Sequence, residues 1–162
     1  METILIADLS FPKHAESVVY LLNEYAKDEM GGGAELSDWV KQNLVPELSK
    51  RQGIHVVIAF VDEDPAGLVI CIEGFSSFAC KPLLNVHDLV VAAKYRGRGL
   101  SKRLLASVED EAKKRGCCKL TLEVLEGNRV AQAAYKSCGF EGYALNPALG
   151  NAQFWQKKLD AQ

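Results

Sequence analysis

The residues best suited to chemistry form one short run, Tyr95-Arg96-Gly97-Arg98-Gly99-Leu100-Ser101. The run follows an apolar, β-prone segment and opens a stretch whose apolar residues have helical spacing. Glycines let a backbone approach a ligand closely, and a helix start offers unpaired N–H groups with positive dipole charge. With two arginines added, the run predicts an anion site suited to a pyrophosphate. The alternative is an ordinary strand-to-helix turn with exposed arginines.

Two other phosphate-binding motifs do not fit this run. A P-loop requires Gly-x-x-x-x-Gly-Lys-Ser/Thr, which is absent. A dinucleotide fingerprint requires Gly-x-Gly-x-x-Gly, and position 102, where the third glycine would stand, is a lysine.

A second group of side chains shares one face of a later helix. Asn128, Ala131 and Tyr135 are three and four residues apart, so they point the same way. A polar cap, a small residue and a phenol on one face are consistent with a functional site. The alternative is a core helix in which the tyrosine is packed and its hydroxyl satisfied.

The elements that must position these groups follow from periodicity. Residues 100–115 predict a helix with one apolar stripe, a basic end that suits the dipole, and Gly116 as its C′ residue. Ser37 and Asn128 are expected to cap further helices, and Pro46 to kink or divide the first of these. The expected helices cover 15–26, 37–48, 100–115 and 128–138, and the expected strands cover 3–7, 56–61, 68–72, 83–91, 119–124 and 154–159. We expect a turn at 63–67 and an irregular loop at 75–82. This order predicts an α/β or α+β domain with a mixed sheet.

Composition limits the class of protein. The 162 residues fit one domain, 1–162, and 48% hydrophobic residues allow a sizeable core. A net charge of −2 argues against a nucleic-acid surface. No apolar run approaches a membrane span, and the first residues lack a secretion signal, so we expect a cytoplasmic protein without nucleic-acid or membrane partners. The odd number of five cysteines suggests reduced thiols, with the adjacent pair Cys117-Cys118 ending a helix and starting a strand.

The chemical motifs together resemble the GNAT acetyltransferase superfamily. Residues 96–101 are similar to its acyl-CoA signature, Gln/Arg-x-x-Gly-x-Gly/Ala, except that Ser101 replaces the last small residue. Asn128, Ala131, Tyr135 and the following Gly139-Phe140 resemble the family's Asn-x-x-Ala-x-x-x-Tyr-x-x-x-Gly-Phe segment.

This resemblance implies a GNAT fold that binds acetyl-CoA without a metal. The parallel strands 83–91 and 119–124 would splay apart around the pantetheine arm. Backbone groups of 89–91 would bind that arm and the thioester carbonyl, amides of 98–102 would hold the pyrophosphate, and the side chain of Asn128 would contact the arm. The implied cofactor-binding residues are Leu89, Val90, Val91, Arg96, Gly97, Arg98, Gly99, Leu100, Ser101, Lys102, Asn128, Ala131 and Tyr135.

The implied reaction is direct attack of an amine on the thioester, which needs a base for the ammonium proton. His87, Asp88 and Glu123 are the candidates. Adjacent strand residues face opposite sides, so only one of the first two should face the site unless a bulge intervenes. Histidine titrates nearest to neutral pH. The polyamine acetyltransferase branch has two acidic residues here, and His87 departs from that pattern. Tyr135 would be the acid that protonates the leaving thiolate.

The partners remain open at this stage. We expect a small-molecule amine as acceptor, and the resemblance implies a homodimer with Phe154-Trp155 near the interface. The acceptor side would be built by the N-terminal helices and the 75–82 loop, from Glu35, Asp38, Trp39, Glu73, Phe75 and Phe78. The alternatives are a protein acetyltransferase acting on a lysine or N-terminus, a non-catalytic acyl-CoA sensor, and a thiol-redox protein that uses Cys117-Cys118.

Overall fold

The computed structural model describes residues 1–159 and has one mixed sheet of five strands in the order β1-β2-β3-β4-β5. The first four strands pair antiparallel and the last pair is parallel. The strands are β1 (Glu2–Ile6), β2 (Ile54–Val61), β3 (Asp64–Ser76), β4 (Lys81–Val91) and β5 (Leu120–Leu122). The helices are α1 (Pro12–Lys27), α2 (Asp38–Ser49), α3 (Leu100–Lys114) and α4 (Arg129–Ser137), with 3-10 turns η1 (Glu29–Gly31), η2 (Ala93–Tyr95) and η3 (Pro147–Leu149). The predicted α/β fold with a mixed sheet is confirmed.

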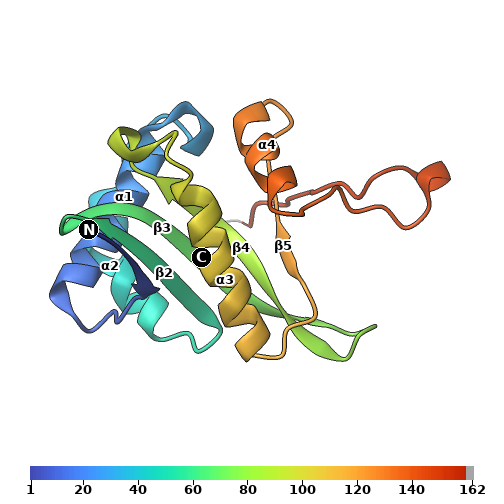
Figure 1. Cartoon of the computed structure of the whole chain (residues 1–162), viewed down its shortest axis with the longest axis horizontal. Helices are drawn as coiled ribbons and strands as arrows, with labels where there is room; N and C mark the ends of the chain where they lie inside the picture. Colours follow the sequence, from blue (N-terminus) through green and yellow to red (C-terminus); the bar gives the residue numbers. More distant parts are fainter. Residues whose placement is uncertain (160–162) are drawn as a thin grey trace.

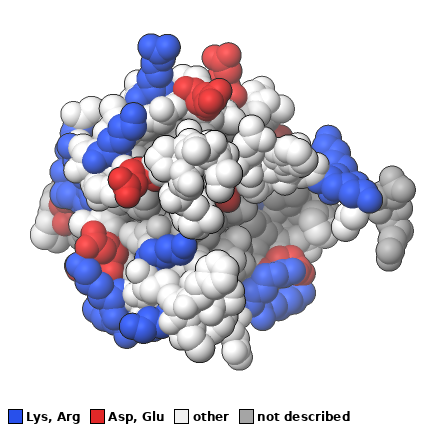
Figure 2. Space-filling view, turned by 90° about the vertical axis from the view of Figure 1, so that its right-hand side faces the viewer, with Lys and Arg blue, Asp and Glu red and all other residues white. Residues whose placement is uncertain are grey.

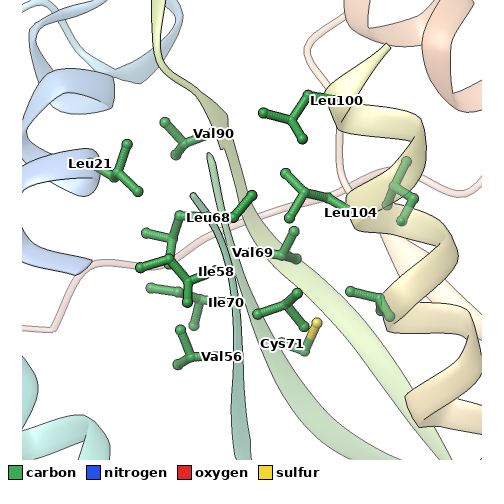
Figure 3. Close-up of a cluster of buried hydrophobic side chains, with 14 of the residues drawn as sticks. Leu21, Val56, Ile58, Leu68, Val69, Ile70, Cys71, Val90, Leu100 and Leu104 are labelled. Atoms are coloured by element: carbon green, nitrogen blue, oxygen red, sulfur yellow. The ribbon is translucent and has the colours of Figure 1, made fainter. Parts of the chain in front are cut away.

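Helices cover both faces of this sheet (Figure 1). Figure 3 shows the sheet from its edge, with Leu21 of α1 on one side and Leu100 and Leu104 of α3 on the other. These three side chains are at most 2% exposed. The apolar stripe of α3 is buried because it faces β2, β3 and β4, which leaves the N-terminus of that helix beside the end of β4.

The central hairpins are longer than the sequence predicts. β2 and β3 join through Asp62 and Glu63, whose positive φ values of 48° and 71° suit a two-residue hairpin turn. β3 continues to Ser76, which pairs with Lys81. The irregular loop expected at 75–82 is therefore wrong for half of its length, because ladder pairing extends both strands and leaves only residues 77–80 as a turn.

Local capping follows the predictions, whereas the break at Pro46 does not occur. The Ser37 hydroxyl accepts from the Val40 amide at 3.3 Å, and the Asn128 side chain accepts from the Ala131 amide at 3.1 Å. α2 continues through Pro46 to Ser49. Pro46 lies near the end of α2, so it removes one helical hydrogen bond where few remain.

The end of the described chain departs most from expectation. β5 has three residues instead of six, and residues 154–159 form no strand. Instead, the chain after α4 leaves the body as an extended segment with η3 at its tip, visible in orange and red in Figure 1. The predicted strand is wrong here because its apolar residues contact no neighbouring strand. Among residues 1–159, no helix is long and apolar enough to cross a membrane.

Candidate active site

The Gly-Arg loop forms the turn between η2 and α3. Gly97 and Gly99 both have φ values of +74°, which only glycine adopts without strain. Gly99 is the N-cap of α3, and no side chain caps the helix. The amides of 97–101 donate to no backbone carbonyl among the described residues. Five N–H groups are thus free beside a positive helix end, an arrangement that fits a pyrophosphate.

Side-chain contacts of Arg103 and Arg98 hold this loop in place. The Arg103 guanidinium donates from Nη1 to the Arg98 carbonyl oxygen at 3.0 Å. Its Nε and Nη2 donate to the two carboxylate oxygens of Glu2, at 2.6 and 2.7 Å. The Arg98 guanidinium stacks over the buried Tyr95 ring, 5.5 Å from its centroid. Sequence reasoning missed Arg103 and Glu2, because no local pattern reveals a contact between residues 101 positions apart.

Arg96 turns toward the other side of the loop. Its Nε donates to the Val91 carbonyl oxygen at 3.0 Å, and its Nη2 donates to Asp28 at 3.2 Å. The other Asp28 oxygen accepts from the Met30 amide at 3.0 Å. That hydrogen bond, and then Arg96, lower the pKa of the Asp28 carboxyl. Arg96 and Asp28, which we call the Arg96–Asp28 clasp, therefore tie the end of β4 to the loop after α1.

The two parallel strands separate beside this loop. β4 and β5 pair only from Leu84 to Val86 with residues 120–122. The Asn85 side-chain nitrogen Nδ2 donates to the Thr121 hydroxyl at 3.0 Å and joins the strands at that end. Beyond this point β4 runs to Val91 with no β5 partner. One edge of 89–91 is therefore open, as the expected pantetheine slot requires.

A β-bulge in β4 determines which side of the sheet His87 and Asp88, the two candidate bases on this strand, each face. Ile70 pairs with Asp88 and Cys71 pairs with Val86, so His87 is the extra residue and has no partner. Paired antiparallel residues share a face, and Ile70 points to the α1 side in Figure 3. Asp88 therefore faces α1 and is partly buried, whereas His87 is exposed.

Two tyrosines lie on the same side as Asp88. Burial raises the pKa of the Asp88 carboxyl, with a smaller opposing effect from His87. Burial, together with the nearby charges of Asp88 and Asp28, raises the pKa of the Tyr25 phenol. Burial also raises the pKa of the Tyr135 phenol, with a smaller contribution from Tyr25. Asp88 is thus near enough to Tyr25, and Tyr25 near enough to Tyr135, for the charge of the first to affect the pKa of the second. Sequence reasoning did not find Tyr25.

The remaining predicted residues of the α4 face are arranged as follows. The Asn128 side-chain oxygen is used as the helix cap, which leaves its amide nitrogen for another partner. Ala131 and Tyr135 are partly buried, and the Tyr135 ring lies 6.0 Å from that of Phe140, edge to face. Leu100 is buried, Ser101 is partly buried and Lys102 is exposed. Glu123, the third candidate base, is exposed just after β5.

A cavity of about 200 Å³ adjoins the end of β4. It is lined by Glu24, Tyr25, Lys27 and Asp28 from the α1 side, by 90–93 and by Arg96, and Lys27 pairs with Glu24. The aromatic residues expected at the acceptor side do not line this cavity, and Trp39, Phe75 and Phe78 are 68%, 64% and 101% exposed. Of the expected acidic residues, Glu35 pairs with Lys41 and Glu73 with His55.

Other chemistry has less support in the structure. All five cysteines are free, and burial raises the pKa of the Cys71 thiol to about 12. The Cys118 amide donates to the Pro82 carbonyl oxygen at 2.8 Å, so this cysteine lies at the start of the chain toward β5. Within residues 1–159, no three His, Cys, Asp or Glu side chains are grouped so as to hold a metal ion.

Comparison with known proteins gives concordant matches. The model of the acetyltransferase (GNAT) family matches residues 18–140. A thialysine N-epsilon-acetyltransferase of Bos taurus is 35% identical over 163 residues, covering 83% of this chain and 91% of that protein. One from Caenorhabditis elegans is 26% identical, covering 80% and 78%. The fold is also similar to a solved structure described as a probable acetyltransferase, with a TM-score of 0.79, 21% identity and 99% of each chain covered.

Proposed function

Because the chain belongs to the GNAT family and is an N-acetyltransferase, we propose that it transfers the acetyl group of acetyl-CoA to a primary amine of a small molecule. The free amides at 97–101, beside the open edge of β4, are the observation that carries this proposal. The amides supply donors for a pyrophosphate, and the unpaired strand edge supplies backbone groups for an extended arm. We further propose a cytoplasmic location, where the cysteines would stay reduced.

The chain's own residues would act on the thioester in four ways. The amides of 97–101 bind the pyrophosphate, assisted by the positive end of α3. A backbone amide among Leu89–Val91 polarises the thioester carbonyl. Asp88, directly or through a water molecule, accepts the proton of the attacking ammonium. The Tyr135 phenol donates a proton to the departing thiolate.

The acceptor is proposed to be a cationic amine that enters from the α1 side. The carboxylates of Glu24 and Asp28 line the cavity there, and Asp88 faces the same side of the sheet. The two thialysine N-epsilon-acetyltransferase relatives support an acceptor with a terminal amine. His87 stands outside this group, which argues for Asp88 as the base.

The proposal is tested by acetyl-CoA turnover across polyamines, thialysine, lysine, aminoglycosides and a peptide. Release of free CoA with one small-amine class is the expected result. Turnover with the peptide alone would assign the chain to protein acetylation, and binding without turnover would make it a sensor. Gly99→Val serves as the binding control, because a β-branched residue at φ +74° is strained and its side chain would crowd Arg103. Acetyl-CoA should raise the melting temperature of wild type but not of this variant.

A further inference from the structure

The peptide unit between Arg98 and Gly99 is held by a single side chain. Its carbonyl oxygen accepts from Arg103 Nη1 at 3.0 Å, and no backbone amide among residues 1–159 donates to it. The Gly99 amide of the same unit donates to no backbone carbonyl in that part of the chain. The next unit differs, because the Gly99 carbonyl oxygen accepts from the Lys102 and Arg103 amides at the start of α3. The orientation of the 98–99 unit therefore depends on the Arg103 side chain.

This contact determines where one of the free amides points. A trans peptide unit is planar, so its C=O and its N–H point in opposite directions. Holding the Arg98 carbonyl against Arg103 thus directs the Gly99 N–H away from Arg103, where it is free to donate to a ligand. Glycine adopts positive and negative φ about equally well, so Gly99 offers little resistance to rotation of this unit. A rotated unit would present a carbonyl oxygen to an anion in place of an N–H.

Glu2 fixes the Arg103 guanidinium in turn. The two Glu2 carboxylate oxygens accept from Nε and Nη2 at 2.6 and 2.7 Å, a fork-to-fork pairing that adds geometric precision to charge attraction. The Glu2 backbone pairs with Val61 in the sheet, so the carboxylate has a fixed base. Arg103 lowers the pKa of the Glu2 carboxyl by hydrogen bonding. One guanidinium therefore connects β1 to the loop, a geometry that the point charge of a lysine does not reproduce.

We propose that Glu2 is a positioning residue for acetyl-CoA. Through Arg103, it orients the 98–99 peptide unit so that the Gly99 amide donates to the pyrophosphate. Glu2 itself does not touch the cofactor. The inference rests on the proposed function, because it requires the pyrophosphate to bind at 97–101.

Direct electrostatics makes the opposite prediction for Glu2. Removing a carboxylate from the neighbourhood of an anion site should strengthen anion binding, and a released Arg103 would be able to pair with a phosphate. Lys and Arg side chains are interspersed with Asp and Glu on the face that Figure 2 shows, so no broad field of one sign covers that side. The sign of the change in CoA affinity therefore separates positioning from direct attraction.

Titration calorimetry of CoA against the full chain tests the proposal. Glu2→Ala should raise the Kd about fivefold, the upper range for one exposed ion pair. Arg103→Ala should raise it at least as much, and the double variant should add nothing, because Glu2 acts only through Arg103. Glu47→Ala is the matched control, because it removes an exposed, arginine-paired carboxylate on α2 and should leave the Kd unchanged. Melting temperatures would verify that each variant is folded.

A truncated donor supplies a second readout. S-acetylpantetheine carries the thioester but no pyrophosphate, so Glu2→Ala should lower kcat/KM for acetyl-CoA and leave it unchanged for S-acetylpantetheine. The kcat at saturating acetyl-CoA should also stay the same. General damage to the site would lower both values of kcat/KM. Glu2→Gln keeps the size of the side chain and serves the same tests if the alanine variant does not fold.

Three results would overturn the inference: CoA binding to Glu2→Ala as tight as wild type or tighter, fully additive losses in the double variant, or equal losses with both donors. If wild type binds CoA and transfers acetyl groups while Glu2→Ala behaves identically, this inference alone fails. If wild type does not bind CoA, the proposed function fails and the inference fails with it.

Discussion

The β-bulge in β4 predicts that substitutions of the adjacent residues His87 and Asp88 have different effects on kcat. Asp88→Asn keeps size and shape but removes the proton acceptor, so kcat should fall by at least about 10²-fold, the lower end for general acid–base catalysis. His87→Ala removes an exposed side chain that has no partner in the ladder. Its kcat should remain within about threefold of wild type, because surface changes away from a site have small effects.

The pH dependence sharpens this comparison. Burial raises the pKa of Asp88, so the acid limb of kcat should lie above the ordinary aspartate range. The sign for stability is the opposite of a surface aspartate: stability linked to this group is largest below its unfolded pKa and is lost as pH rises through the raised folded pKa. Asp88→Asn should abolish that loss and should not lower the melting temperature at pH 8.

The assay is steady-state release of CoA from pH 5 to 9, with melting temperatures measured at the same pH values. A collapse of kcat in His87→Ala, with Asp88→Asn near wild type, would refute the argument from the bulge. Loss of activity in both variants with unchanged acetyl-CoA binding would mean that the two residues act together. Retention in both would assign the proton to Glu123 or to water.

Three further predictions concern other parts of the molecule. Tyr135→Phe keeps the packed ring but removes the phenol, so kcat should fall about 10²-fold with acetyl-CoA affinity unchanged; turnover within threefold of wild type would show that it is not the acid. Asp28→Asn should weaken acetyl-CoA binding through loss of the clasp, and combining it with Arg96→Lys should add little, whereas fully additive losses in a double-mutant cycle would deny the coupling. Gly67→Ala should destabilise the fold by about 1–3 kcal/mol in urea unfolding, since its new methyl group would lie 2.7 Å from Leu104 Cδ1; unchanged stability would mean that α3 shifts freely.

The features predicted well from sequence are those fixed by local chemistry. Ser37 and Asn128 cap helices because a short polar side chain reaches an amide three residues on. Gly99 immediately precedes the apolar stripe of α3 and ends the loop with a positive φ, a conformation that glycine adopts without strain. The helical spacing of apolar residues predicted α3, because one face of this helix is buried along its length.

Features that depend on distant partners could not be predicted. The bulge at His87 exists only in the register with β3, so alternation along one strand could not tell which of His87 and Asp88 faces α1. Asp28 and Tyr25 enter the site because α1 packs on β4, and no spacing in the sequence encodes that contact. Residues 154–159 have the composition of a strand, but a strand also needs a neighbour to pair with.

The short pairing of β4 with β5, which ends at Val86 and Leu122, has a consequence for exchange with solvent. β4 and β5 are hydrogen-bonded at one end and separated at the other. An extended ligand between them would form the backbone hydrogen bonds that β5 does not form with residues 89–91. Amide hydrogens near 89–91 that face the gap should exchange rapidly with deuterium in the empty protein and slowly when the gap is filled. Amides paired with β3 should change little. An exchange map would therefore reveal the ligand as a strand of the sheet, with protection that alternates from one residue to the next.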